Sequence, residues 1–342
     1  MDLGKLDFEV IMYSDFVHRN ELFDLLENRG DYNKANMDKL EEIASNPDIN
    51  HKEFVKTLHK IFPFEKNPWI YTNHKAHNRP PLNEMYPASR GLHAFRRYFS
   101  QMAHQHRAKD GNKKFDKEGL VTIEKFANAR WLKGAREELE AFPVGVNKQP
   151  HNILTQNKDV ASILNKISEK SYDHIVKCLG GETKEIRKKF EQNTFAQRVH
   201  NKPGDGDHQK YAHVDTFFPA IKWWWFPDEV KLEHGPFHYA KGSCYPTDTY
   251  LDWVFHESMN IIEGKYPKWK GKDHMEGSYR VSEEELIAME FELEPITVKA
   301  NTLVIANVAG FHSRGEVKQE YIRNAIHGSI RIEKPFEWNN ND

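Results

Sequence analysis

A histidine and a carboxylate separated by a single residue, in His213-Val214-Asp215, constrain this chain more than any other feature. Residues two apart in an extended strand point to the same side, so His213 and Asp215 can approach one metal ion. A second histidine, His312, lies far downstream in another apolar segment. If His312 supplies a third ligand, the chain must fold so that two strands remote in sequence lie side by side. A closed, barrel-like arrangement of strands meets that requirement.

Arg323 follows His312 by eleven residues, where a next strand could direct its guanidinium back into the same pocket. A planar guanidinium is the natural partner of a carboxylate, because it offers two parallel donors. Two histidines and one carboxylate leave up to three positions open on a metal, which is typical of non-haem Fe(II) oxygenases. Together, the ligand set and the carboxylate clamp predict an iron enzyme that uses a keto acid as co-substrate.

The residues around these positions form a succession of short strands and turns. Residues 211–219 are typical of a strand that runs into a turn, and residues 221–226 of a buried aromatic strand ended by Pro227. A short strand ends in the turn Gly242-Ser243-Cys244, and residues 302–307 form a further apolar strand before His312.

This succession resembles the phytanoyl-CoA dioxygenase (PhyH) family of Fe(II)/2-oxoglutarate oxygenases, over about Thr194 to Arg331. The family pattern is a His-x-Asp-Thr segment, an aromatic strand, a strand ending in Gly-Ser-His, a distal histidine and then an arginine. The resemblance implies that His213, Asp215 and His312 are iron ligands. It also implies that Arg323 binds the distal carboxylate of 2-oxoglutarate.

The chain departs from the family pattern at one turn, where Gly242-Ser243-Cys244 replaces Gly-Ser-His. The histidine of that turn is not an iron ligand in the family, so the implied ligand set is unaffected. The departure does put in doubt any substrate contact made from the turn. We also expect Ser313, directly after His312, to add a hydrogen bond near the distal carboxylate of 2-oxoglutarate.

The implied reaction is oxidation of a small-molecule C–H bond with Fe(II), 2-oxoglutarate and O2. The outcome would be hydroxylation, or oxidative cyclisation or desaturation, of a substrate such as an acidic, amino-acid-derived intermediate of natural-product biosynthesis. Two other classes stay open: a non-catalytic cupin-like metal-binding module, and a zinc hydrolase, because two histidines and a carboxylate also bind zinc. Arg323 argues against both, since neither requires a carboxylate clamp.

A basic stretch offers candidates for substrate binding. Residues 85–109 contain no acidic residue, and Arg90 and Arg97 are seven residues apart, on one stripe of a helix. They could bind an acidic substrate. The alternative is a solvated basic face that pairs with acidic residues elsewhere.

The aromatic strand offers another candidate. Strand alternation places Trp224 on one face and its two tryptophan neighbours on the other. Trp224 could therefore meet substrate, with core packing as the alternative. His327 and Arg331 lie at even offsets from Arg323, so all three could point the same way. We expect His327 to pack near the site rather than to bind metal.

Apolar spacing along the chain is helical first and strand-like later. It predicts helices over 15–28, 51–61, 91–108, 122–141, 159–177 and 183–192, and Ser282 with Glu285 forms a capping-box start to another. We therefore predict an α+β fold with a double-stranded β-helix (jelly roll, cupin-like) core over 191–335 and a helical insertion. A mainly helical portion, residues 1–190, would pack on that core as one integrated domain.

Composition narrows the class further. The 342 residues carry a net charge of −2, which gives no global field to recruit nucleic acid or a membrane surface. Sparse cysteine use, Cys178 and Cys244, favours reduced thiols. The N-terminus lacks an apolar signal region, and no run is long enough to span a membrane. We expect a soluble cytoplasmic protein with a small-molecule substrate.

Overall fold

The computed structural model describes residues 113–331 with gaps: 113–142, 144, 152–153, 162–179, 181–182, 184–204, 208–215, 220–244, 249–250, 253, 257, 260, 265, 267–270 and 279–331. Arg90, Arg97 and the helices expected over 15–28, 51–61 and 91–108 lie outside the described residues. No helix of the described part is long and apolar enough to cross a membrane.

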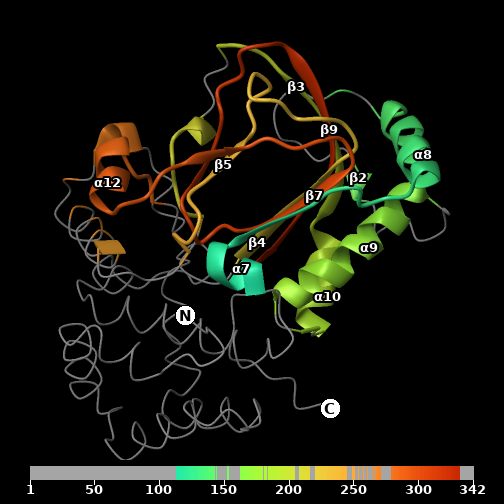
Figure 1. The fold of residues 1–342 in the computed structure, drawn as a ribbon, viewed down its shortest axis with the longest axis horizontal. Coiled ribbons are helices and arrows are strands. Elements are labelled where there is room, and N and C mark those ends of the chain that lie inside the picture. The colour runs from blue at the N-terminus through green and yellow to red at the C-terminus, as the bar shows by residue number, and fades with distance from the viewer. Residues whose placement is uncertain are drawn as a thin grey trace, which may run out of the picture.

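The described residues form helices and two antiparallel sheets (Figure 1). The larger sheet has six strands in the order β1-β7-β4-β9-β3-β2, so neighbours in space are mostly distant in sequence. Its strands are β1 (Leu120–Ile123), β2 (Asn152–Ile153), β3 (Thr194–Asn201), β4 (Ala220–Phe226), β7 (Thr302–Asn307) and β9 (Tyr321–Arg331).

The smaller sheet has three strands in the order β6-β5-β8 and faces the larger one (Figure 1). These strands are β5 (Phe237–Tyr239), β6 (Glu294–Ile296) and β8 (His312–Arg314). Apolar side chains from both sheets form one buried cluster, which includes Tyr239 from β5 and Val304 from β7. The two sheets are thus packed face to face over an apolar interior.

Helices cover the outer face of the larger sheet (Figure 1). They are α8 (Ala129–Glu140), α9 (Ile163–Cys178) and α10 (Lys184–Gln192). The described residues also include helices α7 (Lys113–Glu118) and α12 (Glu283–Ala288), with short 3-10 turns η4 (His208–Lys210) and η5 (Lys268–Lys270). The expected capping box is present at α12: Ser282 accepts a hydrogen bond from the Glu285 backbone, and the Glu285 side chain accepts one from the Ser282 backbone.

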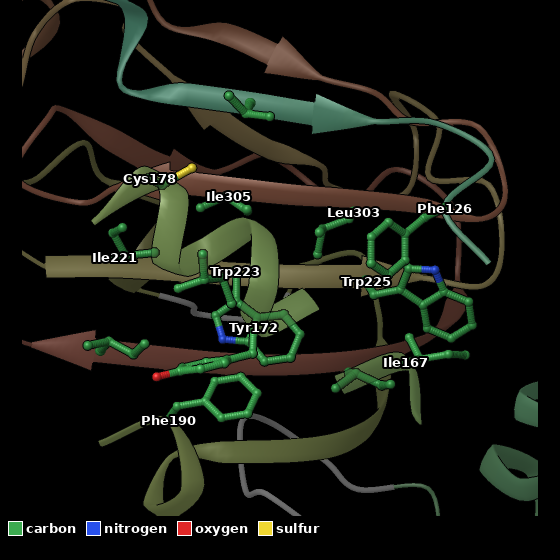
Figure 2. Packing of buried hydrophobic residues seen from close by; sticks show 14 of the residues in the cluster. Phe126, Ile167, Tyr172, Cys178, Phe190, Ile221, Trp223, Trp225, Leu303 and Ile305 are labelled. Atoms are coloured by element: carbon green, nitrogen blue, oxygen red, sulfur yellow. The ribbon is translucent and has the colours of Figure 1, made fainter. Parts of the chain in front are cut away.

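The main hydrophobic core lies between these helices and the larger sheet (Figure 2). Trp223 and Trp225 are fully buried there, and Trp223 stacks on Phe190 of α10 with ring centroids 5.7 Å apart. Gly328 on β9 lies directly opposite Trp223. A Cβ at that glycine would stand 2.4 Å from the Trp223 indole nitrogen, so the sheet needs a glycine there to hold the tryptophan.

Trp224 lies on the opposite face of β4, between the sheets, as alternation predicts. It stacks on His327 of β9 and packs against Phe237 of β5, with ring centroids 5.1 and 5.0 Å apart. The larger sheet therefore has a helix-covered outer face and an inner face that looks toward the smaller sheet.

The helix expected over 122–141 begins later than predicted. Residues 120–123 form β1, which pairs with β7, and α8 starts at Ala129. Three of the four residues of β1, Val121, Thr122 and Ile123, are β-branched and therefore favour a strand. Pairing with β7 decides that this segment is a strand and not part of a helix. The larger sheet thus includes strands on both sides of residue 190. Cys178 and Cys244 are not joined in a disulfide bond.

Candidate metal centre

A pair of backbone hydrogen bonds brings the two histidines together. The His213 amide donates to the His312 carbonyl at 2.9 Å, and the His312 amide donates to the His213 carbonyl at 3.0 Å. Residues that exchange both bonds in an antiparallel pair carry their side chains on the same face. The two imidazole centroids are accordingly 4.3 Å apart.

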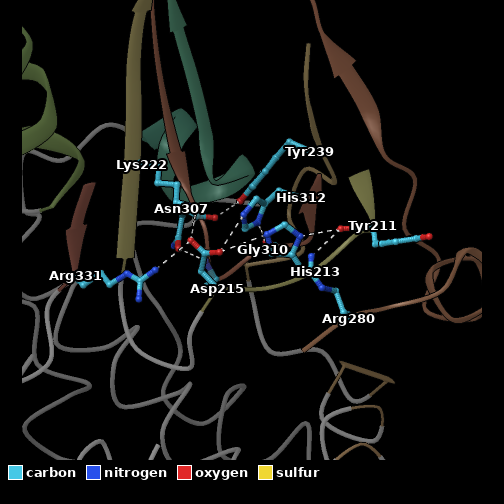
Figure 3. A network of polar contacts seen from close by, with 11 residues as sticks. Tyr211, His213, Asp215, Lys222, Tyr239, Arg280, Asn307, Gly310, His312 and Arg331 are labelled. Atoms are coloured by element: carbon cyan, nitrogen blue, oxygen red, sulfur yellow. Dashed lines mark hydrogen bonds and ion pairs between the residues drawn. The ribbon is translucent and has the colours of Figure 1, made fainter. Parts of the chain in front are cut away.

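Asp215 completes the cluster, because residue i+2 of an extended segment shares the face of residue i. Its amide donates to the Val308 carbonyl at 3.0 Å, which holds this segment against the end of β7. The carboxylate oxygen Oδ1 is 3.5 Å from Nε2 of His213 and 3.5 Å from Nε2 of His312. One ligand atom from each of the three residues lies within 4.8 Å of the others, and all three residues are buried (Figure 3).

Backbone carbonyls fix which nitrogen of each imidazole faces the cluster. Nδ1 of His213 is 2.8 Å from the Tyr211 carbonyl, and Nδ1 of His312 is 2.9 Å from the Gly310 carbonyl. A carbonyl only accepts, so each Nδ1 carries the proton and each Nε2 presents a lone pair. Both Nε2 atoms are buried and lack a hydrogen-bond partner among the described residues. Two inward-facing lone pairs beside a carboxylate suit a divalent metal ion.

The electrostatics of the cluster keep His213 neutral. Burial lowers the pKa of His213 to about 4, with a further contribution from the neighbouring His312, while Asp215 opposes the shift. A metal binds the neutral imidazole, so this histidine needs no deprotonation near neutral pH.

Asp215 stays ionised because cations offset its burial. Burial alone would raise the pKa of Asp215, but the Lys222 ammonium beside the carboxylate holds that pKa well below its usual range. Nζ of Lys222 is 2.5 Å from Oδ2 of Asp215, and Nη2 of Arg331 is 3.7 Å from the same oxygen. Lys222 comes from β4 and Arg331 from the end of β9, on the side of Asp215 away from the histidines (Figure 3).

The turn Gly242-Ser243-Cys244, where the chain departs from the family pattern, supports the distal histidine. The buried Ser243 hydroxyl donates to the Ala240 carbonyl at 2.6 Å and accepts the Phe311 amide at 2.8 Å. Phe311 precedes His312, so the turn fixes the backbone from which that imidazole projects. Gly310 is packed so closely here that a Cβ would lie 2.8 Å from the Ser243 hydroxyl.

Arg323 lies on β9, in register with Val199 of β3. Even spacing places it on the same face of β9 as His327 and Arg331, which both contact residues of the inner face. Its Nη1 donates to the Gly235 carbonyl at 3.4 Å. Burial lowers the pKa of His327 to about 4; the Lys222 and Arg323 charges add to the lowering, while the Trp223 carbonyl and Asp215 oppose it.

The remaining candidates lie in different places. Trp224 is on the inner face, in contact with His327 and with Phe237, whose ring centroid is 5.7 Å from that of His312. Ser313 follows His312 on β8 and pairs with His238, so alternation directs its side chain away from the face of His312. The structure therefore does not bring Ser313 together with the ligand cluster.

The place of Lys222 beside Asp215 was not predicted from the sequence, although a signal was present. Lys222 interrupts an otherwise apolar strand at an even offset from Trp224, and both facts indicate an inward-facing charge. The carbonyls of Tyr211 and Gly310 carry no side-chain signal, so only the fold reveals that they orient the histidines.

Comparison with protein-family models gives no match, and neither does comparison with the sequences of curated proteins. Solved structures give distant likenesses. The epimerase SnoN, in complex with Fe3+, alpha ketoglutarate and nogalamycin RO, is 11% identical, with a TM-score of 0.40 over 63% of this chain and 80% of its own.

Iron-bound HygX from Streptomyces hygroscopicus is 14% identical, with a TM-score of 0.39 over 63% of this chain and 83% of its own. The non-heme alpha ketoglutarate dependent carbocyclase SnoK is 12% identical, with a TM-score of 0.38 over 65% of this chain and 83% of its own. Likenesses this distant assign no activity to the chain, so its function has to be inferred from its own residues.

Proposed function

We propose that this protein is an Fe(II)/2-oxoglutarate-dependent dioxygenase of the PhyH type, with His213, Asp215 and His312 as iron ligands. The observation that carries the proposal is the pair of buried Nε2 lone pairs beside the Asp215 carboxylate, all within 4.8 Å of one another. Three ligands of this kind leave coordination positions open for a co-substrate and for O2.

Arg323 is the proposed partner of the distal carboxylate of 2-oxoglutarate. Support comes from its place on the inner face of β9, the face that also carries His327 and Arg331. A dicarboxylate that reaches from the cluster toward Arg323 would lie along the stacked rings of Trp224 and His327. Trp224 would then form a wall of the pocket.

The two facing sheets support the proposal of a double-stranded β-helix core. They bring together the candidate ligands His213 and His312, which are far apart in the sequence. We propose that the core extends over about 191–335. The earlier residues, 1–190, would pack on it within one integrated domain, since β1, β2 and the helices α8–α10 already do so.

Bound iron would supply the oxygen activation that couples decarboxylation of 2-oxoglutarate to cleavage of a substrate C–H bond. The chain contributes the rest. Backbone carbonyls hold both imidazoles in the metal-binding tautomer, and Lys222 keeps Asp215 charged. The proposed product is a hydroxylated, cyclised or desaturated small molecule. An acidic substrate held by Arg90 and Arg97 remains part of the proposal.

The test is turnover of 2-oxoglutarate by iron-loaded protein. Wild type should release succinate, and His213→Ala and His312→Ala should each reduce release by at least about a hundredfold, since each removes a ligand. His200→Ala is the matched control, because His200 pairs with Glu320 away from the cluster.

Succinate release that survives in both ligand variants would contradict the proposal. A zinc hydrolase would instead copurify with zinc and release no succinate under any loading. A non-catalytic binding module would bind metal without either activity. Metal analysis together with the succinate assay therefore separates the three classes.

A further inference from the structure

The carboxylate of Asp215 is divided between two sets of partners. Oδ1 faces the histidines, at 3.5 Å from each Nε2. Oδ2 faces the cations, at 2.5 Å from Nζ of Lys222 and 3.7 Å from Nη2 of Arg331. Only one oxygen of this carboxylate is directed at the point where the two imidazole lone pairs converge.

We propose that Lys222 is a positioning residue that restricts Asp215 to binding a metal through one oxygen. This inference rests on the proposed metal centre. Asp215 and Lys222 are both largely withdrawn from solvent, with side chains 8% and 21% exposed, so water competes weakly for Oδ2. A charge-assisted contact in such surroundings is strong enough to set the orientation of the carboxylate.

The position of Lys222 in the larger sheet allows it to orient the Asp215 carboxylate. It pairs with Ala306 on one side and with Ser329 on the other, so its backbone is fixed in the middle of the larger sheet. Its neighbours on the outer face, Ile221 and Trp223, are buried against the helices. Because its backbone is held in a central strand, the Lys222 side chain projects from a fixed position, and its ammonium contacts the Asp215 carboxylate.

The consequence concerns how many metal positions remain open. With one oxygen from Asp215 and two imidazoles, the protein fills three positions. If both oxygens were bound, it would fill four, and a co-substrate that binds through two atoms would compete with O2. Lys222 therefore keeps one more coordination position open. It also lowers the affinity for the metal ion, because its positive charge repels the ion.

The experiment compares wild type with Lys222→Met, which keeps the length of the side chain and removes its charge. Calorimetric titration with Co(II) alone should show metal binding about tenfold tighter in the variant. In protein loaded with Co(II) and 2-oxoglutarate, nitric oxide, a probe of the position that O2 would take, should bind about tenfold more weakly to the variant. Lys222→Arg should restore both values, and Lys299→Met, on an exposed lysine paired with Glu124, should change neither.

Crystal structures of the Co(II)-loaded proteins give the direct readout. Wild type should bind Co(II) through one oxygen of Asp215, and Lys222→Met through both. A variant that binds Co(II) more weakly than wild type, or still through one oxygen, would overturn the inference and leave Lys222 a structural residue. If wild type itself does not hold Co(II) at His213, Asp215 and His312, the proposed function fails as well.

Discussion

At the scale of single residues, the candidate site depends on atoms that no motif specifies. His213 and His312 are recognisable in the sequence, but their usable nitrogen is set by the carbonyls of Tyr211 and Gly310. Arg323 is recognisable by its spacing from His312. It lies on the inner face of β9, as its proposed role in binding the distal carboxylate of 2-oxoglutarate requires.

Arg323 provides a prediction at this scale. Arg323→Met should weaken 2-oxoglutarate binding to Co(II)-loaded protein by about ten- to a hundredfold, because it removes a hydrogen bond between charged groups. Co(II) binding itself should not change, since Arg323 is not a proposed ligand. Calorimetry measures both.

Arg187→Met is the matched control for that experiment, because Arg187 pairs with Glu169 and Glu191 among the outer helices. Equal loss of 2-oxoglutarate binding in the control would point to general damage. Unchanged binding in Arg323→Met would remove Arg323 from the site.

At the scale of elements, β4 joins the core to the site through alternation. Its odd-numbered residues Trp223 and Trp225 pack under the helices, while Lys222 and Trp224 face the interior between the sheets. The same strand therefore serves the main core with one face and the candidate site with the other.

Gly328, which lies opposite Trp223, tests how tightly the outer face of this sheet is packed. Gly328→Ala should lower the free energy of unfolding by about 1–3 kcal/mol, because the new methyl group would overlap the indole. Urea denaturation measures the loss. The double variant Gly328→Ala/Trp223→Phe should recover part of it, since the smaller ring leaves room.

A double variant no more stable than Gly328→Ala alone would show that the overlap with Trp223 is not the cause. The Asn193 carbonyl, 3.0 Å from the same added Cβ, would then be the group responsible.

At the scale of the whole molecule, a polar cluster lies inside a protein whose two sheets otherwise meet through apolar side chains. Burial of titratable groups makes stability depend on pH. His327 is the clearest case away from the proposed ligands: burial lowers its pKa to about 4, although its Nδ1 donates to the Trp223 carbonyl.

The sign follows from proton uptake. An unfolded chain binds a proton at His327 below pH about 6.5, whereas the folded protein resists it until about pH 4. Stability therefore falls as pH drops through this window. Between pH 7.5 and 5.0, wild type should lose about 1–2 kcal/mol more than His327→Gln in urea denaturation. Parallel losses in the two proteins would contradict this account of His327.

The sequence by itself determined what is local or repeats along the chain. The sequence predicted the alternation of β4 and the capping box at Ser282. It also predicted helices over 159–177 and 183–192, which correspond to α9 and α10, and the residue types of the candidate ligands. The strand over 120–123 could not be told from a helix, because short apolar runs fit both periods until a partner strand is present.

Only the tertiary structure decided which distant atoms meet. His312 reaches His213 through reciprocal backbone bonds, and Lys222 reaches Asp215 because β4 occupies a central place in the larger sheet. Backbone hydrogen bonds and strand order are long-range properties that the identity of a residue does not encode. The chemistry of each group could therefore be predicted from the sequence, whereas the contacts of Asp215 with histidines on one side and cations on the other could not.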